Sequence, residues 1–288
     1  MAKPFVNPFV SGQFLELRVD ALVSDGRGLG RHDGVVVLVE DALPGQLVRA
    51  RVDAVRKSLA EAALVEVLER SPDEQEPPCP HAGRCGGCSW QSLAYDRQLA
   101  WKERIVHDAL ERVGKVACPP MLPILPSPSE WGYRNKMEFA FGVSGDGGKA
   151  LGLRERGSRN IVEVTGCLLQ TPLTMRVLEA VRMLSNGAFH DLDGRFLVVR
   201  EPNAGGCFVE LIVGAGGSLE AGERFAEALR TEIPEVTGFA LSERLAPSDV
   251  AYGERALYAD GRLEERIGDV RLQMGHNAFF QVNTPAAE

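Results

Sequence analysis

Short apolar runs interrupted by glycine-containing turns open the chain. Four such runs occupy residues 14–23, 35–39, 47–55 and 62–68, and Asp-Gly or Pro-Gly pairs stand between them. Strands of this length separated by tight turns are typical of a small antiparallel barrel. We therefore predict a small OB-like β-barrel at residues 8–70. Barrels of this kind commonly bind oligonucleotides, but a barrel can also serve as a spacer, so the pattern leaves its use open.

Apolar positions at helical intervals then mark the clearest helix of the chain, within residues 93–115. Gly114 is a suitable C-terminal stop for it. Residues 71–92 before this helix form a loop that starts as a linker rich in Pro, Glu and Asp and ends in a cluster of cysteines. The apolar positions of the helix are Leu99, Ile105, Val106, Ala109, Leu110 and Val113.

The following part of the chain alternates strand-like and helix-like segments. A proline-rich connector at residues 119–128 can neither continue a helix nor fill a central strand. The pattern beyond it predicts a central α+β domain at residues 116–277. Its expected strands lie at 136–143, 150–154, 195–200 and 207–213, and its expected helices at 173–184 and 219–229.

Length and composition fit a globular protein of about two domains, with 288 residues of which 44% are hydrophobic. The sequence has no run of roughly 18 uncharged apolar residues. Residues 1–10 lack the basic, apolar and small-residue succession of a signal peptide. We therefore expect a cytoplasmic protein with no membrane partner.

A net charge of −8 argues against a nucleic-acid partner unless positive charge is concentrated locally. Residues 133–160 provide such a concentration, with six Lys or Arg residues against three carboxylates. A solvated polar face is the alternative interpretation of this cluster. The RNA-contacting candidates within it are Arg134, Lys136, Arg154 and Arg156.

Three cysteines stand close together as C-x5-C-G-G-C, namely Cys79, Cys85 and Cys88. Disulfides are rare in the cytoplasm, so this spacing predicts a metal site on one tight loop. A fourth ligand must come from elsewhere, and Cys167 is the best candidate because it follows a strand-like segment. Spacing alone leaves zinc and a [4Fe–4S] cluster equally open. Cys207 lies in an apolar strand and is interpreted as a core residue.

Four stretches together resemble the RNA uracil-5-methyltransferase family. Residues 79–91 (CPHAGRCGGCSWQ) resemble its iron–sulfur signature, and residues 131–139 (WGYRNKMEF) are similar to its strand after the first helix. Residues 161–167 (IVEVTGC) correspond to the segment of the fourth cluster cysteine, and residues 278–283 (AFFQVN) to the opening of its methyltransferase domain. The order and spacing of the four make the resemblance specific, whereas any one alone is weak.

The resemblance implies several properties that the residues alone do not establish. It implies that the barrel is a TRAM domain and that Cys79, Cys85, Cys88 and Cys167 bind a [4Fe–4S] cluster. It also implies that Gln281 contacts S-adenosylmethionine, with Phe279 and Asn283 lining the same region. The expected activity is methylation of C5 of a uridine in ribosomal or transfer RNA, with 23S rRNA as the preferred candidate.

In this family a cysteine adds to C6 of the uracil, C5 takes the methyl group and a base removes the C5 proton. The target base must leave its stack, so splayed or single-stranded RNA is expected. Residues 278–288 would start the methyltransferase domain, and we expect its Rossmann-like fold to be mostly missing. We therefore assign no catalytic residue and expect the chain to be an inactive fragment or a prematurely ended reading frame.

One further expectation follows from the resemblance, that the helix within residues 93–115 packs on the methyltransferase domain. Two alternatives to the enzyme remain open. A non-catalytic iron–sulfur RNA-binding module would use the same barrel and cysteines, and a zinc-stabilised adaptor would have no role with RNA.

Overall fold

The structure is a computed structural model that describes residues 7–145, 147–214 and 216–288. Most of the segment assessed for a signal peptide, residues 1–6, lies outside the described residues. The chain forms two compact units. The first comprises Met1–Gly83 and Cys88–Pro126, and the second comprises Arg84–Gly87 and Ser127–Glu288.

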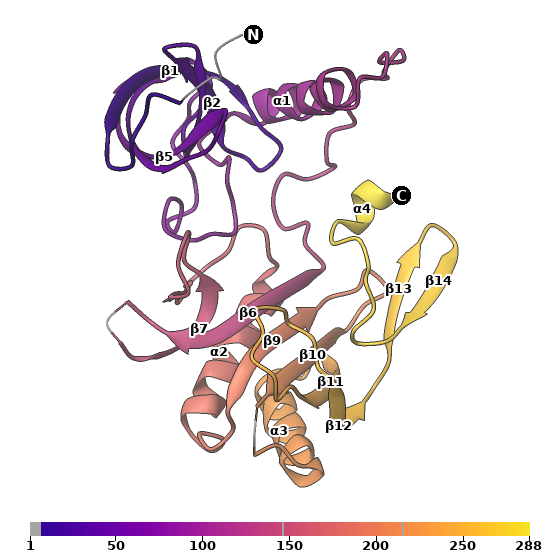
Figure 1. Ribbon diagram of the computed structural model, residues 1–288. Helices are drawn as coiled ribbons and strands as arrows, with labels where there is room; N and C mark the ends of the chain where they lie inside the picture. The colour runs from indigo at the N-terminus through magenta and orange to yellow at the C-terminus, as the bar shows by residue number, and fades with distance from the viewer. Residues whose placement is uncertain (1–6, 146, 215) are drawn as a thin grey trace. The chain divides into compact units, whose positions relative to one another are not determined.

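The first unit contains a closed five-stranded barrel in the order β1-β2-β3-β5-β4, so the predicted barrel is confirmed (Figure 1). Of its described strands, only β3 and β5 pair in parallel. In β1, Leu15, Leu17 and Val19 alternate inward into the barrel core. The strands are β1 (Phe14–Leu22), β2 (Gly28–His32), β3 (Val35–Glu40), β4 (Leu47–Val55) and β5 (Leu59–Glu69).

Strand β2 escaped prediction because its sequence, GLGRH, contains a single apolar side chain. The glycines of this strand are needed by its tight pairing with β1. A Cβ atom at Gly30 would lie 2.3 Å from the carbonyl oxygen of Arg18, which excludes any larger residue without a backbone shift. The register shifts near this point, between Val19 and Ala21.

Helix α1 (Tyr95–Asp108) continues into a π-helical turn, η1 (Ala109–Val113), which confirms the predicted helix. Within the first unit, Trp101 and Ile105 of α1 pack against a small cluster of buried leucines. Val113 remains 81% exposed. The leucines of this cluster are Leu22, Leu43 and Leu93.

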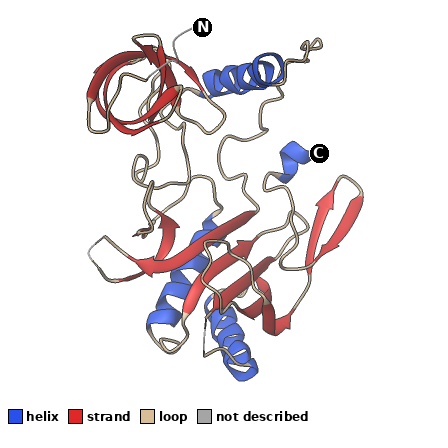
Figure 2. Ribbon diagram, viewed as in Figure 1, coloured by secondary structure: helices blue, strands red, loops and turns tan. Residues whose placement is uncertain are grey.

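The second unit is built on a seven-stranded sheet in the order β12-β11-β10-β9-β6-β7-β8. Among these described strands, only β10 and β11 pair in parallel, and α3 connects them. Helices α2 (Pro172–Asn186) and α3 (Leu219–Glu232) lie against one side of the sheet (Figures 1 and 2). The strands are β6 (Lys136–Val143), β7 (Lys149–Arg154), β8 (Ile161–Val162), β9 (Gly194–Arg200), β10 (Cys207–Val213), β11 (Val236–Glu243) and β12 (Arg255–Asp260).

The two faces of this sheet differ in composition. We call the face that packs against α2 and α3 the helix-covered face, and its strand residues include Phe139, Leu197, Leu211, Phe239 and Leu241. We call the opposite face the loop-covered face. It contains apolar residues but also the buried polar side chains Arg200, Glu210 and Ser242.

The last part of the second unit consists of a hairpin and a short terminal helix. The hairpin comprises β13 (Leu263–Ile267) and β14 (Val270–Met274), and the terminal helix is α4 (Thr284–Ala287). Figure 2 shows residues between them as loop, which matches their irregular backbone. Among the described residues, no helix combines the length and the apolar character needed to cross a membrane.

Candidate functional site

Asn135 connects two of the sequence motifs that carry the resemblance. It belongs to residues 131–139, and its backbone N–H donates to the carbonyl oxygen of Val282 at 2.8 Å. Its side-chain Nδ2 donates to the carbonyl oxygen of Gln281 at 2.9 Å and to Oγ1 of Thr284 at 2.8 Å. These bonds bring residues 131–139 against residues 278–284, although about 140 positions separate the two segments in the sequence.

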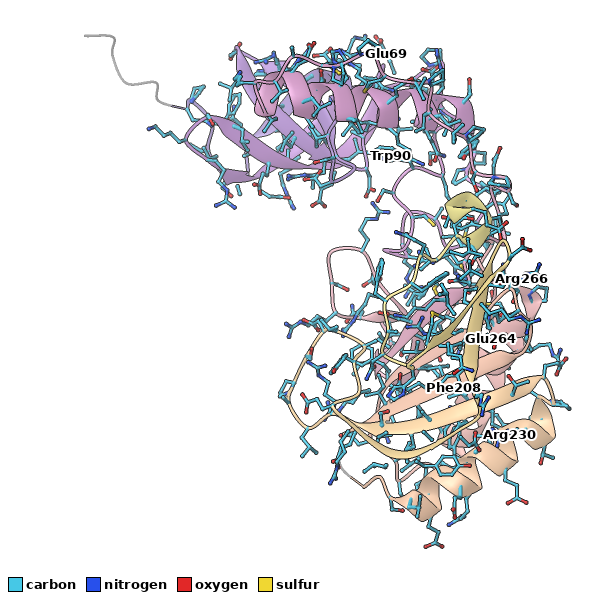
Figure 3. All side chains as sticks on the ribbon, turned by 90° about the vertical axis from the view of Figure 1, so that its right-hand side faces the viewer. Glu69, Trp90, Phe208, Arg230, Glu264 and Arg266 are labelled. Carbon is cyan, nitrogen blue, oxygen red and sulfur yellow. The ribbon has the colours of Figure 1, made fainter. Side chains whose placement is uncertain are left out.

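A buried carboxylate lies beneath this contact. Glu265 of β13 is 1% exposed, and its Oε2 accepts hydrogen bonds from Asn135 Nδ2 and Thr284 Oγ1, both at 3.2 Å. Its Oε1 accepts from the backbone N–H groups of Asn203 at 2.9 Å and Arg266 at 3.0 Å. A buried carboxylate is costly unless it is hydrogen-bonded, and this one receives four donors. Its strand neighbours Glu264 and Arg266 are labelled in Figure 3.

The three residues predicted to bind the cofactor lie in the segment that Asn135 fixes. Phe279 is 85% exposed, and the side chain of Gln281 is also exposed. Asn283 has a structural role, because its Oδ1 accepts from the N–H of Ala286 at 3.2 Å and so caps α4. Its Nδ2 donates to Oγ of Ser127 at 2.9 Å. The structure thus leaves Phe279 and Gln281 accessible, whereas Asn283 is engaged.

A cleft of about 260 Å³ lies beside this segment in the second unit. Its walls combine aromatic and polar residues with the first residues of the terminal helix. Residues from both 131–139 and 278–283 line this cleft. The sequence alone did not indicate that these two segments share a cleft. The lining residues that matter here are Trp131, Tyr133, Arg134, Asn203 and Asn283.

The predicted RNA-contacting residues lie at the neighbouring ends of β6 and β7. Lys136 begins β6 and pairs with Glu138 at 2.5 Å, and Arg134 Nε donates to the Lys136 carbonyl oxygen at 3.4 Å. Arg154 ends β7 and pairs with Asp249 at 3.2 Å. The positive charges of Lys136 and Arg154 are therefore partly balanced by carboxylates, and all four residues stay predicted RNA contacts.

Residues 84–86 of the cysteine loop pair with residues 154–156, at and just beyond the C-terminal end of β7. The N–H of Gly86 donates to the Arg154 carbonyl oxygen at 2.9 Å, and the N–H of Arg156 donates to the Arg84 carbonyl oxygen at 2.9 Å. A Cβ atom at Gly86 would lie 3.2 Å from the Arg154 oxygen, so glycine suits this approach. Cys85 is thereby paired with Glu155, beside two of the predicted RNA-contacting arginines.

The predicted metal ligands are thiols of intermediate exposure. Cys79 and Cys88 belong to the first unit, and Cys85 and Cys167 belong to the second. Within residues 7–145, 147–214 and 216–288, no group of three or more His, Cys, Asp or Glu residues is placed to hold a metal ion. The donor chemistry nevertheless suits an iron–sulfur cluster, since thiolates are its usual ligands and the Gly87 N–H donates to Cys85 Sγ at 3.4 Å. The ligand set stays a prediction.

Cys207 is buried in β10 on the helix-covered face, as the sequence predicted. Burial raises the pKa of its thiol to about 12, with smaller contributions from Glu201 and Glu235. A thiol with this pKa is almost entirely protonated at neutral pH and is a poor nucleophile.

Sequence reasoning missed the roles of Asn135 and Glu265. Asn135 stood inside a recognised motif, but nothing in the motif indicates which residue connects it to the C-terminal segment. Glu265 stands in the run LEERI, where the alternation of apolar and charged residues gives a signal. A charged residue at an inward position of a strand is a candidate for a structural or functional role.

Comparisons with known proteins agree with this architecture. Residues 8–65 match the TRAM domain model. An uncharacterized RNA methyltransferase of Nitratidesulfovibrio vulgaris is 45% identical over 97% of this chain and 62% of its own length. An uncharacterized RNA methyltransferase of Thermosynechococcus vestitus is 33% identical over 96% of this chain and 63% of its own length. The chain thus spans somewhat less than two thirds of these relatives.

A solved structure shares the fold. The Pyrococcus abyssi tRNA (uracil-54, C5)-methyltransferase, in complex with S-adenosyl-L-homocysteine, matches with a TM-score of 0.68 and 23% identity. The match covers 94% of this chain and 62% of that chain.

The predicted fold class is wrong in one part, the statement that the methyltransferase domain is mostly missing. Nearly the whole chain aligns with the structure of a methyltransferase. The physical reason for the error lies in residues 278–288, which were interpreted as the opening of a further domain. In the structure, Gln281, Val282 and Thr284 are hydrogen-bonded to Asn135, and Thr284 also to Glu265, within the second unit. The inactivity inferred from a missing domain loses its basis.

The predicted TRAM barrel is confirmed by both the family model and the closed barrel of β1 to β5. The similarity to the two relatives extends over nearly the whole chain, well beyond the barrel. Over nearly its whole length the chain is therefore similar to proteins named as RNA methyltransferases, and it carries a TRAM domain.

Proposed function

We propose that this protein transfers a methyl group from S-adenosylmethionine to C5 of a uridine in RNA. The observation that carries the proposal is the hydrogen bonding of Asn135, which joins residues 131–139 to residues 278–284. Both segments carry the resemblance to uracil-5-methyltransferases. The named activity of the Pyrococcus abyssi neighbour, a tRNA uracil-54 C5-methyltransferase, supports the same reaction class.

The TRAM barrel and the basic ends of β6 and β7 would bind RNA. Barrels of this type commonly bind oligonucleotides, and Arg and Lys side chains neutralise phosphates. We propose Arg134, Lys136, Arg154 and Arg156 as phosphate contacts, and a splayed or single-stranded uridine, with 23S rRNA as the first candidate, as the substrate.

Gln281 would contact the cofactor. Its exposed side-chain amide can both donate to and accept from the polar groups of S-adenosylmethionine. The accessible ring of Phe279 offers an apolar surface in the same segment. We assign no catalytic residue. Cys207 is buried with a raised pKa and does not meet the requirements of a nucleophile.

Cys79, Cys85, Cys88 and Cys167 would hold a [4Fe–4S] cluster. When bound, the cluster would fix the cysteine loop through iron–sulfur bonds. Anaerobic purification followed by iron and sulfide analysis tests this assignment. Zinc bound without iron would remove it and would favour the zinc-stabilised adaptor.

The decisive experiment combines labelled S-adenosylmethionine with RNA that lacks the modification. We expect label in RNA and 5-methyluridine after nuclease digestion, detected by mass spectrometry. Label at another base would overturn the reaction class. RNA binding without any methyl transfer would favour the non-catalytic RNA-binding module.

Charge reversal tests the RNA surface separately. The double variant Arg134→Glu and Lys136→Glu should weaken RNA binding and flatten its dependence on salt concentration, because fewer counterions are released. The control is Arg176→Glu on α2, outside the predicted RNA contacts. The Arg176 side chain pairs with Glu235 at 2.9 Å. Equal affinity and slope for the double variant and the wild type would exclude these residues.

A further inference from the structure

One residue, Asn135, is hydrogen-bonded to Gln281, Val282 and Thr284 of the C-terminal segment. Asn135 Nδ2 has two N–H bonds, and three acceptors lie within 3.2 Å of it: the Gln281 carbonyl oxygen, Thr284 Oγ1 and Glu265 Oε2. Its backbone adds a bond from N–H to the Val282 carbonyl oxygen and accepts one from the N–H of Glu201, both at 2.8 Å. The backbone N–H, the backbone carbonyl oxygen and the side-chain Nδ2 of Asn135 therefore all have hydrogen-bond partners.

The orientation of Asn135 is fixed in turn by Glu265. The carboxylate is buried, and all four of its hydrogen-bond donors are neutral groups. Thr284 Oγ1 accepts from Asn135 and donates to Glu265, and Asn135 Nδ2 also lies 3.2 Å from Glu265 Oε2, so the three side chains form a triangle of polar contacts. Because Nδ2 has only two N–H groups for its three acceptors, one N–H is shared between two of them. Closed hydrogen-bond networks restrict side chains to one arrangement, because losing one bond leaves a buried partner unsatisfied.

The side chains next to this triangle are accessible while their backbone is held. Gln281 and Phe279 are exposed, and no described residue forms a hydrogen bond with the Gln281 side-chain amide. Residues 275–283 have no helix or strand of their own, so their position depends on such contacts. A rigid backbone that presents an accessible amide reduces the entropy cost of binding a ligand.

We propose that Asn135, Glu265 and Thr284 form a positioning triangle that presents Gln281 to S-adenosylmethionine. The inference deepens the proposed function and rests on it, since the cofactor contact of Gln281 is part of that proposal. None of the three side chains needs to touch the cofactor. Their effect is transmitted through the backbone of residues 281–284.

The first test replaces Asn135 by Ala and measures the segment and the ligand separately. Hydrogen–deuterium exchange over residues 278–288 and chymotrypsin cleavage after the exposed Phe279 report on the segment. Calorimetric titration with S-adenosylhomocysteine reports on the site. We expect exchange and cleavage to accelerate about 10-fold or more, and the Kd for S-adenosylhomocysteine to rise about 10-fold, with RNA affinity unchanged.

The matched control is Asn160→Ala. Asn160 Nδ2 also donates to a carboxylate, that of Glu155 at 3.0 Å, but lies outside the triangle. This variant should leave exchange, cleavage and the Kd for S-adenosylhomocysteine at wild-type values.

A second pair of variants keeps the proposal testable if Asn135→Ala fails to fold. Thr284→Val has nearly the shape of threonine but lacks the hydroxyl, whereas Thr284→Ser keeps it. Thr284→Val should reproduce the weaker binding, and Thr284→Ser should restore it. In a methylation assay, the loss should appear as a higher KM for S-adenosylmethionine with kcat nearly unchanged.

The outcomes separate this inference from the proposed function. If the wild type binds S-adenosylhomocysteine and both disruptive variants bind it equally well, the positioning role is wrong and the proposed function stands. If the wild type shows no binding, the cofactor role of Gln281 fails, and the positioning role fails with it.

Discussion

The two faces of the seven-stranded sheet are covered in different ways. On the helix-covered face, alternate strand residues such as Phe239 and Leu241 pack against α2 and α3. On the loop-covered face, the covering chain is largely irregular, and a buried arginine, Arg200, donates to the carbonyl oxygen of Ala278 at 2.6 Å. Helices satisfy their own backbone groups, but an irregular segment must find partners in the sheet. The buried polar side chains of this sheet thus lie on the face whose covering chain has little regular secondary structure.

The loop-covered face also contains buried charged groups, which interact with one another and with the covering chain. Burial lowers the pKa of Arg200, and the carboxylates of Glu210 and Glu138 oppose this effect. Glu210 is 2% exposed and lies 3.7 Å from Nε2 of His276, in the covering chain. Gly253 lies so close to the sheet that a Cβ there would be 2.3 Å from that of Ser242. The covering chain is therefore held by the hydrogen bond from Arg200 to Ala278 and by close backbone approach at Gly253.

The largest expected difference concerns the reactivity of Cys207 on the helix-covered face. Its pKa of about 12, against an ordinary 9.0, leaves about a thousandth of the usual thiolate at pH 8. Alkylation of Cys207 by iodoacetamide should therefore be about a thousand-fold slower in the native protein than after denaturation. Mass spectrometry of the Cys207 peptide measures both rates, and equal rates would show that this face is open to solvent.

Truncation of a core side chain on the helix-covered face should destabilise the protein more than either substitution described below for the loop-covered face. Leu241→Ala removes a fully buried side chain that packs against the helices, and we expect the free energy of unfolding to fall by about 2–5 kcal/mol. Urea denaturation followed by circular dichroism measures the change. A loss below about 1 kcal/mol would contradict the tight packing of this face.

Removing the buried cation from the loop-covered face should cost less. Arg200→Met deletes the hydrogen bond to Ala278 and leaves Glu210 without the nearby positive charge, so we expect a loss of about 2 kcal/mol. Arg195→Met is the control on the same strand, because Arg195 is about half exposed and pairs with Asp193. Its effect should stay below about 1 kcal/mol. Similar losses for both variants would remove the special role of Arg200.

The neighbour of Leu241 offers a direct contrast within one strand. Ser242 faces the loop-covered side, is fully buried, and its hydroxyl has no hydrogen-bond partner among the described residues. Ser242→Ala should change the free energy of unfolding by less than about 1 kcal/mol, in either direction, because it removes an unsatisfied polar group. The same urea titration applies, and a loss as large as that of Leu241→Ala would contradict the contrast.

The smallest effect is expected from Asp260 of β12, which pairs with Arg230 of α3, the residue labelled in Figure 3. The hydrogen bond from Arg230 holds the pKa of Asp260 below its ordinary 3.8, so its stabilisation is present above that pH and is lost as the pH falls through the lowered value. Asp260→Asn should cost less than about 1 kcal/mol at pH 7, because both side chains are about one-third exposed. The difference from wild type should shrink below pH 4. A constant difference from pH 7 to pH 3 would contradict the ion pair.

Sequence patterns predicted the elements that obey simple periodicity. The structure confirms the predicted barrel strands, which are all of the barrel except β2, and the predicted strands β6, β7, β9 and β10. It also confirms the predicted helices α1, α2 and α3. Each of these elements follows an alternating, a continuous apolar or a helical pattern. Strands β11 and β12 were missed, because Thr237, Gly238 and Ser242 interrupt the apolar run of β11, and charged residues begin and end β12.

The candidate site was less accessible from the sequence. The motif segments at 131–139 and 278–283 were recognised, but their contact through Asn135 depends on a fold that joins distant positions. Glu265 makes its hydrogen bonds to residues 62 positions earlier and 19 positions later, and local patterns hold no information on such pairings. The metal ligands and RNA contacts stay predictions, because they depend on groups outside the protein.

The placement of Arg84–Gly87 beside the C-terminal end of β7 has a consequence for where this protein can be divided. The second unit takes these four residues from inside the sequence of the first, so neither unit is a single continuous stretch of the chain. A gene fragment that starts at codon 127 would encode a sheet whose β7 end has lost the backbone partners at Arg154 and Arg156. Useful expression boundaries and domain exchanges must therefore keep residues 84–87 together with the part of the chain that follows residue 126.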